Sequence, residues 1–212
     1  MISETYNMDC MEYMRQFPDK HFELAVVDPP YGIGVNKMTL GNGRKKVNRG
    51  NSDWDNEPPP IKYFIELRRV SKNQIIWGAN HFISRMPWNS SCWIFWDKGT
   101  GSNDFADGEL AWTSFDSTVR KYFKSWVGAN AKDESKRCHP TQKPVALYKW
   151  LLSNYAKPGD KILDTHLGSG SSRIAAYDMG FDFYATELDK DYFDAQEKRF
   201  QNFKSQLKLE FA

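Results

Sequence analysis

The stretch KILDTHLGSGSSRIAAYDM, residues 161–179, decides the fold class. Its first four residues are a short, largely apolar run bounded by turn-forming residues, which is typical of a buried strand. A turn rich in glycine and serine follows, and helical spacing of apolar residues begins at 173. Glycines between a strand and a helix let the backbone approach a nucleotide-like ligand, and the helix N-terminus adds N–H donors. The stretch therefore predicts a strand–turn–helix unit that binds a nucleotide.

The next strand completes this candidate cofactor site. Residues 183–187 (FYATE) end in Glu187, seventeen residues after Gly170, close to the spacing at which a carboxylate accepts ribose hydroxyls. A dinucleotide fingerprint would need glycine at 173, where Arg173 stands, so pyrophosphate binding is disfavoured. Adenosine without a pyrophosphate fits, and S-adenosylmethionine is the predicted cofactor. The competing interpretation is a tight turn beside a surface glutamate.

The rest of the chain alternates strands with helices. Apolar runs typical of strands lie at 22–28, 73–78 and 92–96. Helical patterns lie at 61–70, at 147–152 after a start near Pro144, and at 192–203. Strands separated by helices predict an α/β fold with a mostly parallel, doubly wound sheet.

Length and composition exclude several classes of protein. With 212 residues, 40% of them hydrophobic, the chain fits a single domain spanning 1–212 and is not disordered. Lys and Arg total 29 against 27 Asp and Glu, too balanced for a wholly basic coat protein. No apolar run approaches the roughly 20 residues of a membrane helix, and no secretory signal opens the chain. Cys10, Cys92 and Cys138 have no metal-ligand spacing, so we expect no metal, reduced thiols and a cytoplasmic location.

The tetrapeptide Asp28-Pro29-Pro30-Tyr31 follows a buried strand, at the sheet edge where ligands bind in open α/β folds. The exocyclic amine of a nucleobase is a poor nucleophile because its lone pair is delocalised into the ring. Asp28 and the Pro29 carbonyl can each accept one of its N–H groups, which concentrates the lone pair toward an electrophile. Tyr31 offers a flat face for an extruded base, worth about 1–3 kcal/mol. A rigid turn ending in a surface tyrosine is the equally weighted alternative.

The segment HPTQKP, residues 139–144, opens the helical pattern before the strand at 161–164. Pro144 suits a first helical turn, so a plain helix start is the simpler interpretation. The functional interpretation assigns Thr141 and Lys143 to the methionine carboxylate of the cofactor.

Together these motifs resemble the amino-group DNA methyltransferases of the permuted β class, which modify adenine N6 or cytosine N4. The order DPPY (28–31), HPTQKP (139–144), DTHLGSG (164–170) and TELD (186–189) is typical of that class. WGANHF and CWIFWDK also resemble segments of small phage and prophage members. The resemblance implies a Rossmann-like class I methyltransferase fold with circularly permuted motif order and one antiparallel strand in the otherwise parallel sheet.

The resemblance also implies residue roles. The catalytic set is Asp28, Pro29, Pro30 and Tyr31. The cofactor-binding set is Asp9, Asp28, Thr141, Lys143, Asp164, His166, Gly168, Ser169, Gly170, Ser171 and Glu187. Asp9 matches an acidic residue that family members place near the cofactor adenine. His166 departs from the family pattern, because an aromatic residue normally stands there.

Two basic, irregular stretches are expected to serve as short DNA-recognition insertions, around 32–60 and 98–138. Their alternative interpretation is a solvated surface loop. The expected partner is double-stranded DNA, bound mainly through its phosphates. The predicted contacts are Lys37, Arg44, Lys45, Lys46, Arg49, Arg120, Lys121 and Arg137.

The prediction is therefore a site-specific methyltransferase acting on adenine N6 of a flipped base, in a bacterium or a phage-infected host. Cytosine N4 is the nearest alternative, although the family usually carries serine in place of Asp28 for that base. An RNA methyltransferase and an inactive nucleic-acid-binding relic are the more distant ones. Homodimer formation, a restriction partner and the recognition sequence stay open.

Overall fold

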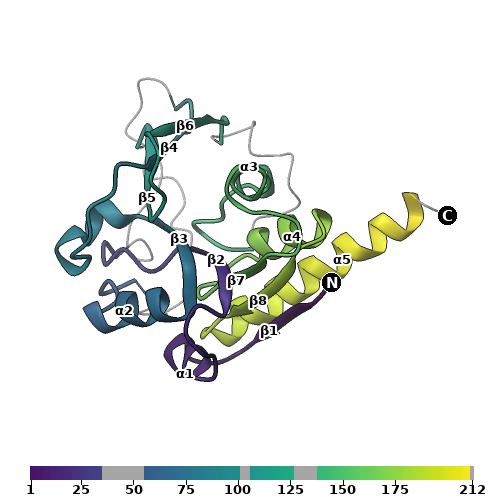
Figure 1. Cartoon of the computed structure of the whole chain (residues 1–212). Coiled ribbons are helices and arrows are strands. Elements are labelled where there is room, and N and C mark those ends of the chain that lie inside the picture. Colours follow the sequence, from purple (N-terminus) through teal and green to yellow (C-terminus); the bar gives the residue numbers. More distant parts are fainter. Residues whose placement is uncertain (35–54, 101–105, 127–137, 211–212) are drawn as a thin grey trace.

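One eight-stranded sheet organises the computed structural model, which describes residues 1–34, 55–100, 106–126 and 138–210 (Figure 1). The strand order is β1-β8-β7-β2-β3-β5-β4-β6. Strand β5 runs antiparallel to both of its neighbours, and every other pairing is parallel. The predicted fold, with a single antiparallel strand, is confirmed.

The elements follow one another in a strand–helix alternation. The strands are β1 (Ser3–Tyr6), β2 (Phe22–Val27), β3 (Ser71–Trp77), β4 (Trp93–Asp97), β5 (Gly108–Thr113), β6 (Arg120–Phe123), β7 (Lys161–Asp164) and β8 (Asp182–Thr186). The α-helices are α1 (Cys10–Met14), α2 (Ile61–Val70), α3 (Val145–Tyr155), α4 (Ser171–Asp178) and α5 (Lys190–Glu210), and two 3₁₀ turns, Ala79–His81 and Ile83–Arg85, follow β3.

Helices cover both faces of the sheet, which explains the continuous apolar runs in its central strands. Along β2, Leu24 and Val26 belong to the core shared with α3 and α4, whereas Ala25 and Val27 belong to the core shared with α1 and α2. In Figure 1, α3 and α4 lie on one side of the sheet and α1 and α2 on the other. Successive side chains of a strand point to opposite faces, so a strand buried on both sides shows no alternation.

The helix starts agree with their local sequence signals. Helix α2 has the predicted bounds, with Pro60 at its N-cap and a buried stripe of Tyr63, Phe64, Leu67 and Val70. Helix α3 begins directly after Pro144, as the proline signal predicts.

Strands β1, β5 and β6 are not predicted from the sequence. Strands β5 and β6 lie inside 98–138, so part of this predicted insertion belongs to the main sheet. Strand β6 (RKYF) is an edge strand with mostly exposed residues, and it therefore lacks the apolar run that identifies a buried strand.

Candidate functional site

A cavity of about 1220 Å³ opens at the carboxyl edge of the sheet. Its wall includes residues that follow five parallel strands: Asp28 after β2, Gly78 after β3, Lys98 after β4, Thr165 after β7 and Glu187 after β8. Strand β5 runs the other way, so its first residues, Gly108 and Glu109, reach the same edge. The strand ends therefore bring sequence-distant motifs into one site.

Most of the predicted site residues line this cavity. The whole catalytic set does so, together with Asp9, Thr141, Lys143, His166, Gly168, Ser169 and Glu187 of the cofactor set. Asp164, Gly170 and Ser171 are not among the lining residues and instead support the turn that forms the wall.

Asp28 is held by two donors within the site. Its Oδ1 accepts a hydrogen bond from the Tyr31 hydroxyl at 2.7 Å, and its Oδ2 pairs with the Lys143 ammonium. Burial raises the pKa of Asp28, and Lys143 opposes that rise. The lysine therefore favours the ionised carboxylate, the form that accepts hydrogen bonds at both oxygens.

Glu109 is a site residue that the sequence analysis missed. Its Oε2 lies 3.0 Å from the Lys143 Nζ, and its Oε1 pairs with Lys98. Burial raises the pKa of Glu109, but Lys143 and Lys98 together outweigh it and lower the pKa to about 2. The available signal was one carboxylate in the otherwise apolar run GELAWT of β5.

The backbone of the DPPY turn is fixed by Asp55. The Asp55 Oδ1 accepts hydrogen bonds from the N–H groups of Tyr31, at 2.8 Å, and Gly32, at 2.9 Å. The Tyr31 ring stacks on His81, with centroids 5.0 Å apart and an interplanar angle of 16°. Gly78 lies so close to the same ring that a Cβ at this position would stand 2.0 Å from it. The proposed stacking of a base on Tyr31 stays a prediction.

The cofactor side of the cavity is built around Glu187. Its Oε2 accepts the Gly168 N–H at 2.8 Å, and its Oε1 accepts the Asp189 N–H at 2.9 Å. Burial raises the pKa of Glu187, and these two backbone donors oppose the rise. Each oxygen keeps acceptor capacity, since a carboxylate has about four acceptor positions. Glu187 is thereby positioned to receive hydroxyl groups from a ligand.

Asp164 stabilises the glycine turn from below. Its Oδ1 accepts the His166 N–H at 3.0 Å, and its Oδ2 accepts the Ser172 hydroxyl at 2.6 Å. Burial raises the pKa of Asp164 to about 7, because neutral donors offset only part of the desolvation. The turn ends at Gly170, whose φ of +72° is the left-handed conformation that glycine favours.

Ser169 and Ser171 are tied to helix α5. Arg199 donates to the Ser169 carbonyl and to the Ser171 hydroxyl, each at 2.8 Å. The two serine hydroxyls lie 3.1 Å apart. These contacts fix the start of α4, and a direct contact of Ser171 with a cofactor stays a prediction.

His166 packs edge-on against Tyr63, with ring centroids 5.3 Å apart. Its Nδ1 lies 2.9 Å from the Thr165 hydroxyl. Burial lowers the pKa of His166 to about 4, so the ring is neutral at pH 7. A neutral imidazole therefore lines the cavity at this position.

The HPTQKP segment closes the cavity between the two sides. The Thr141 hydroxyl lies 3.1 Å from the His139 Nδ1, and the His139 ring contacts Tyr192 of α5. Lys143 is 3% exposed and points at Asp28 and Glu109. Asp9 caps helix α1, with its Oδ1 accepting from the N–H groups of Met11 and Glu12.

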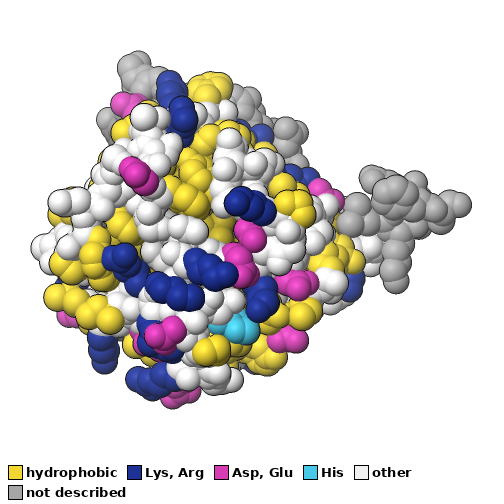
Figure 2. All heavy atoms as spheres, viewed as in Figure 1, with side chains coloured by type: hydrophobic (Ala, Val, Ile, Leu, Met, Phe, Trp, Pro, Cys, Tyr) yellow, Lys and Arg dark blue, Asp and Glu magenta, His cyan; other side chains and the backbone are white. Residues whose placement is uncertain are grey.

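The predicted DNA contacts are described only in part. Lys37, Arg44, Lys45, Lys46, Arg49 and Arg137 lie outside the described residues. Arg120 and Lys121 lie on the exposed edge strand β6, and Lys121 forms a 2.7 Å ion pair with Asp97. Basic and acidic side chains are interspersed on the face drawn in Figure 2, so the view presents no uniformly basic field.

Two further features concern the described part of the chain. No described helix is long and apolar enough to cross a membrane. Within the described ranges, His, Cys, Asp and Glu side chains form no cluster that could hold a metal ion.

Comparisons with known proteins agree with this geometry. A model for N6 and N4 methyltransferases, described as DNA methylase, matches residues 80–198, more than half of the chain. The Type II methyltransferase M.HinfI of Haemophilus influenzae is 26% identical over 92% of this chain and 67% of the relative. The Type II methyltransferase M2.MboI of Moraxella bovis is 24% identical over 97% of this chain and 90% of the relative.

Solved structures share the fold. M1.HpyAVI in complex with SAM has a TM-score of 0.61 at 20% identity, covering 94% of this chain and 98% of that one. The cytosine-N4-specific PvuII DNA methyltransferase has a TM-score of 0.61 at 12% identity, covering 94% of this chain and 86% of that one.

Fold and site together define a methyltransferase of the Rossmann-like class I type. The chain belongs to the DNA methylase family, the N6-adenine and N4-cytosine methyltransferases. The resemblance inferred from the motifs is thereby confirmed, and so is the prediction of an amino-group methyltransferase acting on DNA.

Proposed function

We propose that this enzyme transfers a methyl group from S-adenosylmethionine to the N6 amine of an adenine flipped out of double-stranded DNA. The observation that carries the proposal is the shared cavity: the DPPY turn faces it from β2, and Glu187 with the Gly168 turn faces it from β8 and β7. A site for a base and a site for an adenosine thus open into one space.

The residues present fit S-adenosylmethionine. The Glu187 carboxylate has acceptor positions left for the two ribose hydroxyls. Gly168 and Ser169 form part of the wall. Because Gly168 has no side chain, a ligand can approach its peptide groups closely. The cavity volume of about 1220 Å³ exceeds the roughly 300–1,000 Å³ of common ligand pockets, which leaves room for a base beside the cofactor. The SAM complex of M1.HpyAVI, which shares the fold, supports this choice of donor.

When bound, S-adenosylmethionine supplies an electrophilic methyl group on a sulfonium. Asp28 accepts one N–H of the target amine at acceptor positions that Tyr31 and Lys143 leave open. The Pro29 carbonyl accepts the second N–H. In the transfer, the amine nitrogen would form a bond to the methyl carbon as the bond between that carbon and the sulfonium sulfur breaks, and the Asp28 carboxylate would take up the proton that the nitrogen loses. Proximity and orientation supply most of the rate enhancement, and no covalent enzyme intermediate is needed.

Adenine is the proposed base because Asp28 stands at the first position of the motif, where the cytosine-specific group usually carries serine. Cytosine N4 is the second candidate, since the same acceptors serve its amine equally well. The Type II methyltransferases among the relatives support a site-specific enzyme.

Basic groups from two segments of the chain hold the DNA phosphates in this proposal. Arg120 and Lys121 lie on β6, which runs parallel to β4 and ends at the cavity edge of the sheet. The acid-free run of basic residues at 37–49 supplies the other phosphate contacts. The bacterial cytoplasm is the proposed location, because both DNA and the cofactor are found there. A homodimer stays a prediction.

The test is a product analysis. Unmethylated bacterial DNA is treated with the enzyme and S-adenosylmethionine, digested to nucleosides and examined by mass spectrometry. N6-methyladenine is the expected product. N4-methylcytosine would keep the mechanism and overturn the base assignment, and absence of both products with cofactor bound would overturn the proposed function.

A further inference from the structure

Lys143 has all three ammonium hydrogens directed at protein acceptors. Its Nζ pairs with the Asp28 Oδ2, lies 3.0 Å from the Glu109 Oε2 and donates to the Tyr31 hydroxyl at 3.2 Å. A lysine ammonium has three donors, so these contacts use its full capacity. A cofactor carboxylate could bind this group only by displacing one of them.

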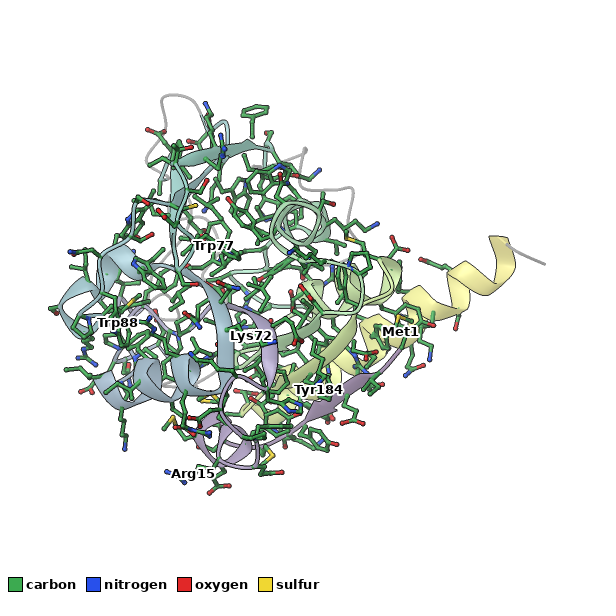
Figure 3. All side chains as sticks on the ribbon, in the orientation of Figure 1. Met1, Arg15, Lys72, Trp77, Trp88 and Tyr184 are labelled. Carbon is green, nitrogen blue, oxygen red and sulfur yellow. The ribbon has the colours of Figure 1, made fainter. Side chains whose placement is uncertain are left out.

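The surroundings of Lys143 also fix its position. Its Nζ lies 5.6 Å from the centre of the Tyr31 ring and 5.5 Å from that of Trp77, within cation–π range. Trp77, labelled in Figure 3, is the last residue of β3 and is fully buried. The ammonium is thus enclosed by two carboxylates and two aromatic rings.

The charges of this partly buried set of side chains alternate and balance. Asp28, Lys143, Glu109 and Lys98 follow one another, each in contact with the next. Glu109 therefore shares its charge between two lysines, whereas Asp28 has one. An isolated buried charge is costly, and an alternating chain of this kind offsets much of that cost.

We propose that Lys143 and Glu109 are positioning residues for the catalytic carboxylate: Glu109 holds the Lys143 ammonium, which in turn orients Asp28 and keeps it ionised for the target amine. This assignment rests on the proposed function and replaces the contact of Lys143 with the methionine carboxylate. Glu109, and Lys98 that pairs with it, thereby join the residues that support the transfer step.

The electrostatic signs give the proposal a specific signature. Lys143 lowers the pKa of Asp28, whereas Glu109 raises it. Removing the lysine therefore moves the Asp28 titration to higher pH, and removing the glutamate charge moves it to lower pH. Among the described residues, Tyr31, Tyr63, Tyr148 and Asp164 also interact electrostatically with Asp28. The two substitutions replace none of these residues. Shifts of opposite sign in the Asp28 pKa would therefore be specific to the contacts among Asp28, Lys143 and Glu109.

The experiment compares Lys143→Met and Glu109→Gln with the wild-type enzyme. Lys72→Met is the matched control, because Lys72 pairs with Glu23 at the opposite end of β3 (Figure 3). We measure kcat at saturating cofactor, the cofactor Kd by calorimetry and the pH profile of kcat/KM. Lys143→Met should lower kcat at least 100-fold with the Kd changed less than threefold. The acid limb of the kcat/KM profile should move to higher pH for Lys143→Met and to lower pH for Glu109→Gln. The Lys72→Met control should leave the acid limb and kcat unchanged.

A second readout does not depend on activity. Asp28→Asn, Lys143→Met and the double variant form a thermodynamic cycle, measured by urea unfolding at pH 7. A coupling of at least tenfold in the unfolding equilibrium is expected. If Lys143→Met misfolds, Glu109→Gln still tests the downward shift of the acid limb, and Lys143→Arg, which keeps the positive charge, should leave the acid limb near its wild-type pH.

The outcomes separate this proposal from the proposed function. A tenfold or greater loss of cofactor affinity in Lys143→Met with kcat retained would overturn the positioning role of Lys143. An acid limb that stays at its wild-type pH, or unfolding effects that are additive in the double variant, would overturn that role as well. A wild-type enzyme that methylates no DNA base would refute the proposed function, while the unfolding cycle would still test the ion chain.

Discussion

Asp28 and Asp164 stand at the ends of neighbouring parallel strands, β2 and β7, and the protein stabilises them by different means. Asp28 faces a buried lysine, whose other contacts are a carboxylate and a phenol. The donors to Asp164 in the described part of the chain are neutral, a serine hydroxyl and a backbone N–H. The pKa of Asp164 accordingly rises to about 7, while Lys143 opposes the rise at Asp28.

The difference follows the work that each carboxylate does. A group that must accept hydrogen bonds from a substrate amine and then its proton has to be ionised before the reaction. A group that only fixes a turn can hold it in either protonation state, because a carboxylic acid still accepts hydrogen bonds. The carboxylate at the DPPY turn is therefore paired with a cation, whereas Asp164 and Glu187 on the cofactor side accept hydrogen bonds from neutral donors.

The largest expected effect comes from removing Asp28, on the side of the cavity where the target base binds in the proposed mechanism (the base side). Asp28→Ala removes the acceptor for the target amine, so transfer should fall at least a thousandfold, about 4 kcal/mol in the barrier. The cofactor Kd should change little, because Glu187 and the Gly168 turn are untouched. Single-turnover assays and calorimetry measure the two quantities.

Asp194→Ala is the control for this experiment. Asp194 is an exposed carboxylate on α5, paired with Lys190, and such surface pairs contribute about 0–1 kcal/mol. Full transfer activity in Asp28→Ala would refute the mechanism.

The next effect concerns the pH dependence of Asp164. Its pKa is about 7 in the folded protein and about 3.9 in an unfolded chain. Between these values the folded state binds more protons, so the free energy of unfolding falls as pH rises. Asp164→Asn should abolish that loss, which is on the order of 4 kcal/mol. Urea unfolding at pH 4.5 and pH 8 tests this, and an unchanged slope would show that Asp164 is ionised throughout.

His166, two residues along, carries the opposite dependence. Its pKa is about 4 when folded and about 6.5 when unfolded, so stability falls as pH drops through this window. His166→Phe should remove a loss on the order of 3 kcal/mol, while leaving kcat within threefold because a ring still faces the cavity. The pH ranges over which Asp164 and His166 change stability overlap, and their effects have opposite sign. Each single substitution should therefore reveal the pH dependence of the free energy of unfolding that the other group contributes. Unfolding curves for the double variant that slope as steeply as either single variant would contradict this compensation.

The contrast between the two carboxylates also marks the limit of what the sequence predicts. Strands buried on both faces have continuous apolar runs, and their carboxyl ends meet at one edge, so Asp28, Asp164 and Glu187 are predictable as neighbours. The contact between Lys143 and Glu109 cannot be predicted in this way, because Glu109 reaches the lysine through the antiparallel pairing of β5 with β4 and β3. That pairing leaves no periodic signal in a six-residue strand surrounded by polar segments.

The smallest effect tests whether the cofactor side depends on backbone shape. Gly170 has a φ of +72°, and a Cβ there would lie 3.1 Å from the Gln196 Cβ of α5. Gly170→Ala therefore adds left-handed strain and crowding, at a cost of about 1–3 kcal/mol. Because the strain sits at the turn that presents Gly168, the cofactor Kd should weaken about tenfold, measured by calorimetry, while kcat at saturation stays within threefold.

Gly159→Ala separates strain from position. Gly159 has a φ of +89° in the turn before β7, and a Cβ there would meet nothing within 4 Å. Its variant should lose comparable stability through strain alone, yet bind cofactor as the wild type does. If Gly159→Ala weakened the Kd as much as Gly170→Ala, loss of global stability would explain both, and the glycine turn would have no special part in shaping the cofactor site. If only Gly170→Ala weakens it, the cofactor side depends on backbone conformation in the way that the base side depends on paired charges.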